Sequence, residues 1–200
     1  MPTRRKVGAL VAASAIVALS RRPALAATYG ERALGPADAP VTIIEYASLT
    51  CPHCAAFHHE TFGKLRETYI DTGKVRFVFR DFPLDGVALR AAALAHCGGD
   101  ERYFGFLDVL FQTQGTWSRA DDPLAELVKI GRLGGLDEAT ARACLDDRDL
   151  IDAIVGSYQR GQDEFGVEST PTLIINGDVF DGERTFENLS KVIDGLLPPS

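Results

Sequence analysis

Hydrophobic positions along this chain follow two periods, one typical of β-strands and one typical of α-helices. Runs rich in β-branched and aromatic residues predict strands at residues 29–34, 41–47, 75–82 and 172–175. The first run is short and is predicted to lie at a sheet edge. Asn176-Gly177 is typical of a tight hairpin turn, so residues 178–181 are predicted to return as an antiparallel partner of the preceding strand.

Helical spacing of apolar residues dominates the rest of the chain. After the second predicted strand, Phe57, Phe62, Leu65 and Tyr69 mark the apolar face of an amphipathic helix. Helices are predicted at residues 52–69, 87–96, 101–114, 123–133, 138–145, 148–165 and 186–197. Asp122 directly precedes a proline, a pairing that favours the start of a helix.

The order of these elements predicts the fold class. A strand, a helix and a strand at the start imply a right-handed crossover and two parallel strands. A hairpin and a helix at the end supply an antiparallel edge and a covering helix. The intervening helices have no strands to cover, so they form a subdomain. We therefore predict an α/β thioredoxin fold, with residues 27–84 and 166–200 as the thioredoxin-like domain and residues 85–165 as a helical insertion.

The candidate reactive site is Cys51-Pro52-His53-Cys54, between the end of the predicted strand at 41–47 and the start of a predicted helix. Free backbone N–H groups and the helix dipole at that point favour negative charge. A thiol there loses its proton easily and becomes a nucleophile near neutral pH, which is the start of thiol–disulfide exchange. A zinc site is disfavoured because the chain has no second Cys-x-x-Cys pair.

The N-terminus has the pattern of a secretory signal peptide, predicted to cover residues 1–26. Basic residues at 4–6 precede an apolar run at 7–19 and a small-residue cleavage site at 24–26. The apolar run is short for a membrane span, although an uncleaved membrane anchor stays an alternative. Residues 3–5 partly match a twin-arginine signal, so the general (Sec) and the twin-arginine (Tat) export routes both stay open.

Cleavage changes the charge of the chain. Five basic residues and no acidic residue leave, so the formal net charge changes from -7 to -12. An acidic surface argues against nucleic acid or anionic lipid as a partner.

The arrangement of motifs resembles the DsbA family of bacterial periplasmic disulfide oxidoreductases. The resemblance rests on Glu45 six residues before Cys51, on the Cys-Pro-His-Cys motif, on the helical insertion, and on Ser169-Thr170-Pro171-Thr172 just before a strand. It covers almost all of the chain that follows the predicted signal peptide.

The matched cysteines take different roles in this resemblance. Cys51 is expected to be the exposed nucleophile and Cys54, one turn into the helix, the more buried resolving thiol. Pro52 and His53 are expected to set the redox poise, His53 by holding a proton or donating a hydrogen bond toward the Cys51 thiolate. The alternative for His53 is an ordinary turn residue. His58, like the histidine after it, is expected to be an exposed helix residue.

Two further sites follow from the same resemblance. Glu45, on the strand below the motif, is expected to take or give the Cys54 proton, with a surface strand residue as the alternative. Pro171 is expected to follow a cis peptide bond that places the Thr170 backbone beside the cysteines, where it pairs with a substrate strand. An ordinary trans turn is the alternative.

Cys97 and Cys144 are the remaining cysteines, and both fall in the predicted helical insertion. Leftover cysteines in an exported protein usually pair. The resemblance agrees, since some relatives carry a second disulfide in this subdomain. Two reduced core thiols are the alternative.

The resulting hypothesis is a monomeric periplasmic enzyme that donates its Cys51–Cys54 disulfide to reduced or misfolded exported proteins, without a cofactor or metal. The family implies a membrane reoxidant of the DsbB type. An isomerase or reductase is one alternative, because threonine before the proline resembles the isomerase pattern. A periplasmic chaperone that keeps the fold but makes little use of the cysteines is another.

Overall fold

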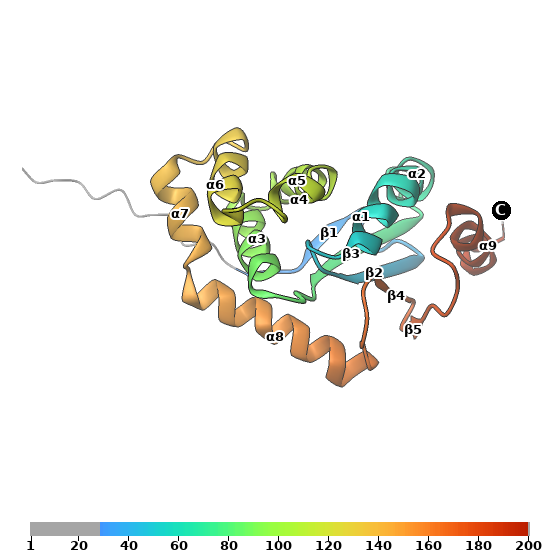
Figure 1. Ribbon diagram of the computed structural model, residues 1–200. Coiled ribbons are helices and arrows are strands. Elements are labelled where there is room, and N and C mark those ends of the chain that lie inside the picture. Colours follow the sequence, from blue (N-terminus) through green and yellow to red (C-terminus); the bar gives the residue numbers. More distant parts are fainter. Residues whose placement is uncertain (1–28, 200) are drawn as a thin grey trace, which may run out of the picture.

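A computed structural model describes residues 29–199 of the chain. The predicted signal peptide, residues 1–26, lies outside the described residues. The described part contains a five-stranded mixed sheet in the order β1-β3-β2-β4-β5. The strands are β1 (Arg32–Leu34), β2 (Val41–Ala47), β3 (Val75–Asp81), β4 (Thr172–Ile175) and β5 (Asp178–Val179). The predicted thioredoxin fold with inserted helices is confirmed (Figure 1).

Strand β2 is the centre of the sheet. It pairs in parallel with β3, from Val41 opposite Val75 to Ala47 opposite Asp81, and antiparallel with β4. Parallel pairing follows from the helical crossover that connects β2 to β3. Pairing with β3 and β4 satisfies the backbone groups on both edges of β2, and helices cover both faces of the sheet, so the side chains of β2 are largely buried. The chain leaves the carboxyl end of β2 directly toward the cysteine motif.

The helices occupy most of the predicted ranges. They are α1 (Pro52–Phe57), η1 (His58–Phe62), α2 (Gly63–Leu65), η2 (Arg66–Ile70), α3 (Gly86–Cys97), α4 (Tyr103–Gln112), α5 (Gln114–Trp117), α6 (Pro123–Leu133), α7 (Glu138–Leu145), α8 (Arg148–Phe165) and α9 (Phe186–Leu196). Aspartates at 85, 122, 137 and 147 accept hydrogen bonds from N–H groups of the first turns that follow them. These local caps explain why several helix starts were predictable.

Three predicted elements were wrong in their extent, and a fourth has its predicted extent but another helix type. The helix predicted at 52–69 contains two π-helical stretches, η1 and η2. The helix predicted at 101–114 is two helices, because the backbone leaves helical geometry at Thr113 (φ -106°, ψ 12°). Strand β1 begins only at Arg32, since Tyr29 packs its ring on His96 instead of continuing the sheet. The last strand ends at Val179 rather than at residue 181.

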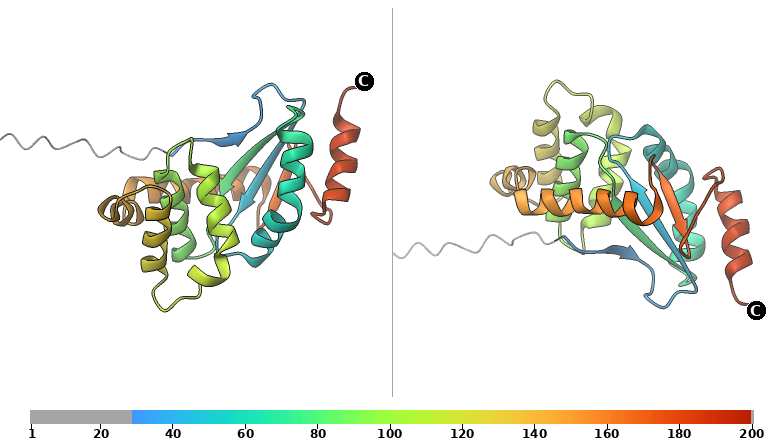
Figure 2. Two further views of the ribbon diagram at one scale, coloured as in Figure 1. Left: turned by 90° about the horizontal axis from the view of Figure 1, so that it is seen from above. Right: turned by 90° about the horizontal axis from the view of Figure 1, so that it is seen from below.

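The helices cover both faces and both ends of the sheet. Helices α3, α4, α6 and α7 gather at one end of the molecule and α9 lies at the other (Figures 1 and 2). Helix α8 runs along the face of the sheet opposite to α1 and α2. Helix α8 can approach the sheet closely at Gly161 because glycine has no side chain; an added Cβ would lie 2.7 Å from the Tyr46 ring.

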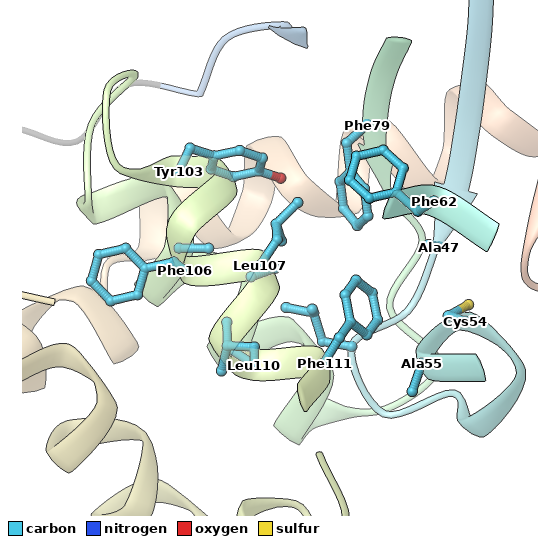
Figure 3. Close-up of a cluster of buried hydrophobic side chains, with 14 of the residues drawn as sticks. Ala47, Cys54, Ala55, Phe62, Phe79, Tyr103, Phe106, Leu107, Leu110 and Phe111 are labelled. Carbon is cyan, nitrogen blue, oxygen red and sulfur yellow. The ribbon is translucent and has the colours of Figure 1, made fainter. Parts of the chain in front are cut away.

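One hydrophobic core joins the inserted helices to the sheet. Leu107 and Phe111 of α4 face Phe62 of η1 and Phe79 of β3 (Figure 3). Both the sheet residues and the helical residues belong to the same contiguous cluster of buried side chains. The helices therefore share the core that supports the cysteine motif.

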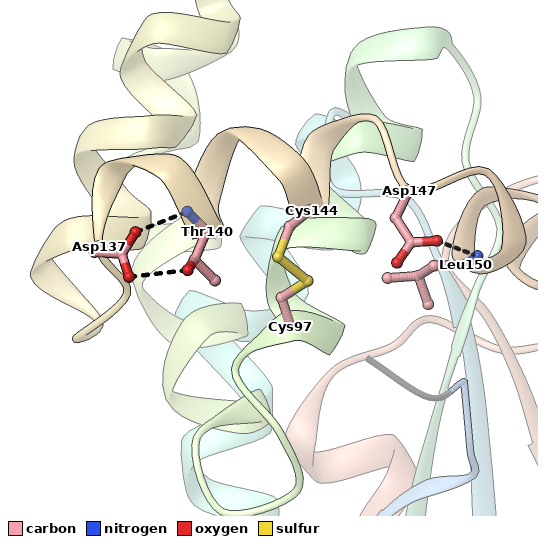
Figure 4. The surroundings of a disulfide bond; sticks show 6 residues. All are labelled: Cys97, Asp137, Thr140, Cys144, Asp147 and Leu150. Carbon is pink, nitrogen blue, oxygen red and sulfur yellow. Dashed lines mark hydrogen bonds between the residues drawn. A yellow bond between two sulfur atoms is a disulfide. The ribbon is translucent and has the colours of Figure 1, made fainter. Parts of the chain in front are cut away.

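A disulfide and a buried polar cluster add specific cross-links. Cys97 at the end of α3 is bonded to Cys144 of α7 (Figure 4). Arg32 Nε donates to His96 Nδ1 (3.3 Å), so the other ring nitrogen carries the proton and donates to Asp81 (2.8 Å). This chain of hydrogen bonds holds β1, α3 and β3 together.

Within residues 29–199, no helix has the length and apolar character needed to cross a membrane. The same residues contain no group of three or more His, Cys, Asp or Glu side chains placed to hold a metal ion.

Replacing both Cys97 and Cys144 by alanine is expected to lower the free energy of unfolding. The disulfide joins residues 47 apart, and closing a loop of that length in the unfolded chain is worth about 4 kcal/mol. Urea denaturation in a Cys51→Ala/Cys54→Ala background, with and without the second pair, isolates this bond. Equal midpoints and slopes for the two proteins would contradict a stabilising role.

Candidate active site

The cysteine motif begins where β2 has ended. Cys51 is the N-cap residue of α1, in an extended conformation. Pro52 occupies the first helical turn, where a backbone N–H has no partner within the helix, so the missing N–H of proline costs no hydrogen bond. The Cys51 N–H donates to the Ser48 carbonyl (3.1 Å), and the Cys51 carbonyl accepts from Ala55 N–H (3.2 Å). The sulfur of Cys51 is thus held at the positive end of a helix.

The pKa of Cys51 is lowered from its ordinary value of 9.0 to about 5. The largest cause is a hydrogen bond from the Cys54 thiol, which outweighs the opposing effect of burial. The backbone N–H groups of Cys54 and His53 lower the pKa further. A thiol with this pKa is a thiolate at neutral pH, and a thiolate is the reactive form in disulfide exchange.

One expectation about the motif needs correction. Cys51 is not exposed: only 5% of its surface is accessible, because Thr170 covers it with a carbonyl oxygen 3.4 Å from the sulfur. The backbone N–H of His53 is among the causes of the lowered pKa of Cys51, and the exposed His53 side chain lines the neighbouring groove. A role of the His53 side chain in setting the redox potential stays a prediction.

Cys54 has the opposite character. It is fully buried, and burial is the main reason that its pKa is raised. The hydrogen bond to Cys51 and the nearby charge of Glu45 raise it further. The pair therefore contains one thiol that ionises readily and one that keeps its proton, so a single hydrogen bond between them stabilises the charge on Cys51.

Glu45 lies in the middle of β2, and its side chain is fully buried. Its Oε2 shares a hydrogen bond of 2.9 Å with Nε2 of His58. The expectation that His58 is exposed is wrong, since its side chain is 5% accessible. One signal could have revealed it: His58 follows Cys54 by four residues, so both lie on one helical face, and a buried carboxyl requires a partner.

The loop before β4 closes the site from the other side. The Thr170–Pro171 peptide bond is cis, and the Thr170 carbonyl faces Cys51. Thr172, the first residue of β4, donates from its hydroxyl to the Ser169 carbonyl (2.7 Å) and pairs with Tyr46 in β2. The loop is therefore anchored to the same central strand that leads into the motif.

A groove of about 470 Å³ opens beside the motif. Its walls include His53 and Glu60 on one side and Thr170, Pro171 and Arg184 on the other. The segment that contains Arg184 is attached to the helix because the Thr61 hydroxyl donates to the Arg184 carbonyl (3.0 Å). Sequence analysis did not identify Glu60 or Arg184, since no local pattern marks residues that meet only at a groove.

Gln114 of α5 was also missed. Its buried side-chain amide donates to the carbonyl oxygens of Leu49 and Cys51, both at 2.9 Å. These bonds satisfy two buried carbonyls in the turn that enters the motif. An inserted helix thus contributes directly to the position of Cys51.

The fold and the polarised cysteine pair define the class of thioredoxin-like proteins with a redox-active Cys-x-x-Cys motif. A family model described as thioredoxin matches residues 27–195. The crystal structure of Wolbachia pipientis alpha-DsbA1 is similar to this chain with a TM-score of 0.78 and 35% sequence identity, covering 83% of this chain and 90% of that chain. The chain belongs to the DsbA family of thioredoxin-fold proteins.

Other relatives agree at lower similarity. A protein of Rickettsia prowazekii with the provisional name protein-disulfide oxidoreductase is 32% identical over 165 residues. That match covers 82% of this chain but only 60% of the Rickettsia protein, so the chain spans less than two thirds of this relative's length. The oxidised BdbD structure from Bacillus subtilis has a TM-score of 0.74 at 22% identity over 83% of this chain and 92% of that chain, which supports the fold.

The ionisation of Cys51 provides the first test of this site. Thiolate absorbance of the reduced protein is expected to titrate with a midpoint near pH 5. Cys54→Ala is expected to move this midpoint upward, because it removes the largest cause of the lowered pKa. Cys51→Ser is the control that removes the signal. A midpoint near 9.0, or no change in Cys54→Ala, would contradict the assigned electrostatics.

Proposed function

We propose that this protein is a thiol–disulfide oxidoreductase that donates its Cys51–Cys54 disulfide to exported proteins. The observation that carries the proposal is the lowered pKa of Cys51 beside the raised pKa of Cys54. A stabilised Cys51 thiolate favours the reduced protein, so the disulfide tends to accept electrons from other thiols. The names and structures of the relatives support the same chemistry.

The reaction proceeds through a mixed disulfide. A substrate thiolate attacks Cys51 Sγ, the bond between Cys51 and Cys54 breaks, and its electron pair leaves on Cys54. Cys54 then takes a proton, and the Glu45 carboxyl is the proposed donor. A second substrate thiolate attacks the substrate sulfur of the mixed disulfide, forming the substrate disulfide and releasing Cys51 as a thiolate. The substrate loses two electrons and the protein gains two.

Substrate binding is proposed to use the groove and the loop before β4. The Thr170 backbone is proposed to pair with an extended peptide, as in other strand-addition complexes. The Thr170 carbonyl lies 3.4 Å from the Cys51 sulfur, which supports this proposal because a peptide bound there would lie beside the reactive thiol. The proposed substrates are reduced or misfolded exported proteins. The proposed compartment is the periplasm, to which a signal peptide directs the chain before it is cleaved off after Ala26. A membrane protein of the DsbB type is the proposed reoxidant, and the protein is proposed to act as a monomer.

A refolding assay with a reduced protein that contains several cysteines tests this function directly. Oxidation of its thiols by the oxidised chain, lost in Cys51→Ser, is the expected result. Faster reshuffling of scrambled disulfides without net oxidation would instead favour an isomerase or reductase, which the threonine before Pro171 keeps as the second candidate. Suppression of aggregation that survives Cys51→Ser would favour a chaperone.

The lowered pKa of Cys51 also predicts a redox dependence of stability. Its folded pKa of about 5 lies below the ordinary value of 9.0, so the thiolate stabilises the folded reduced protein fully above the unfolded pKa, partly at pH 7, and no longer once pH falls through 5. The oxidised pair has no thiolate. The reduced protein is therefore expected to melt at a higher temperature near pH 7, with a gap that shrinks on acidification.

Calorimetry of the Cys97→Ala/Cys144→Ala variant in both active-site states measures this gap without interference from the second disulfide. A higher melting temperature for the oxidised state at neutral pH would count against a strong oxidant and would move the isomerase or reductase function ahead.

A further inference from the structure

The carboxyl group of Glu45 is buried and only half satisfied. Its Oε2 bonds to His58, whereas Oε1 is buried without a hydrogen-bond partner among the described residues. Leaving such an oxygen unpaired is unfavourable, so it calls for an explanation in a protein interior. The unpaired oxygen is available to a group that gains or loses a proton during the reaction.

His58 is held in place by aromatic rings. Its imidazole stacks on Phe111 with ring centres 4.1 Å apart, and it also contacts Phe62 (4.7 Å) and the edges of Phe57 and Phe79. Figure 3 shows Phe62, Phe79 and Phe111 near one another in the core. Its Nδ1 is buried without a partner in the described structure, so its contact with Glu45 is made through Nε2.

The buried thiol of Cys54 lies within electrostatic reach of this pair. The charge of Glu45 is one of the causes that raise the pKa of Cys54. Cys54 is fully buried, so water cannot deliver its proton directly. Two further titratable groups interact electrostatically with the pair, Tyr103 with Glu45 and Asp108 with His58, and both lie on α4. The hydrogen bond that Glu45 forms is to His58.

We propose that His58 is a positioning residue for Glu45. By holding Oε2, it leaves Oε1 directed to the proton that Cys54 takes when its bond to Cys51 breaks and gives up when that bond re-forms. Glu45 passes from acid to carboxylate in the first step and back in the second, so the proton is conserved. This role rests on the proposed function, in which the cysteine pair cycles between disulfide and dithiol.

Two substitutions separate this role from simple filling of the core. His58→Gln places an amide nitrogen near the position of Nε2 and keeps a donor for Glu45. His58→Asn places its amide near the position of Nδ1 and cannot reach Oε2. Both are neutral, polar and similar in size, and His59→Asn on the exposed side of the same helix is the control.

The rate of single-turnover reduction of the oxidised protein by dithiothreitol, measured across pH, reports on opening of the Cys51–Cys54 bond. His58→Asn is expected to slow this step by about 10-fold, which is less than the roughly 100-fold or more for loss of a proton-transfer group, because His58 only positions that group. His58→Gln is expected to stay within about 3-fold of the parent, and His59→Asn to be unchanged. In a Glu45→Gln background, His58→Asn is expected to cause no further slowing, because the carboxyl it positions is gone. Melting temperatures are measured for every variant.

Equal rates for His58→Gln and His58→Asn, or full additivity of His58→Asn with Glu45→Gln, would overturn the proposal. A loss that follows melting temperature across all variants would overturn it as well, since a packing role predicts that correlation. Dithiothreitol reports on the cysteine pair whatever the natural substrate is. Failure of the proposed oxidase function would therefore appear in the refolding assay of the parent protein. The ratio of the dithiothreitol reduction rates of these variants tests the role of His58 separately.

Discussion

The hydrogen bond between the two cysteine sulfurs, at the junction of β2 and α1, is the interaction on which the site depends. It is the largest cause of the lowered pKa of Cys51, and the same bond raises the pKa of Cys54. It can form because one thiol caps the helix and the other lies one turn inside it, fully buried. The rest of the structure maintains this difference in environment between two residues of one motif.

The inserted helices contribute to that environment as well as covering the sheet. Gln114 bonds to the Cys51 carbonyl, and Phe111 stacks on His58. Both belong to the segment that includes α4 and α5, which shares one hydrophobic core with the sheet. A change in the packing of these helices would therefore alter the surroundings of the cysteine pair through these hydrogen bonds and ring contacts.

Two buried carboxyl–histidine pairs connect the central strands to helices. Glu45 of β2 bonds to His58, and Asp81 of β3 bonds to His96. The second pair is extended by Arg32, so it serves as an anchor for β1. The first leaves one carboxyl oxygen unpaired next to the redox site. A fully satisfied network rigidifies a core, whereas an unsatisfied group in a native protein is more often retained for chemistry.

The sequence by itself determined the order of the elements, the helix start at Asp122 and the position of Cys51 at a strand–helix junction. These features depend on periodicity and on bonds between residues a few positions apart. Only the tertiary structure decided that Cys51 is covered by Thr170, 119 residues away, that Gln114 reaches Cys51 across 63 residues, and that His58 is buried against Glu45. Such contacts arise when separate elements pack together, and burial changes the ionisation of a side chain without leaving a mark in its local sequence.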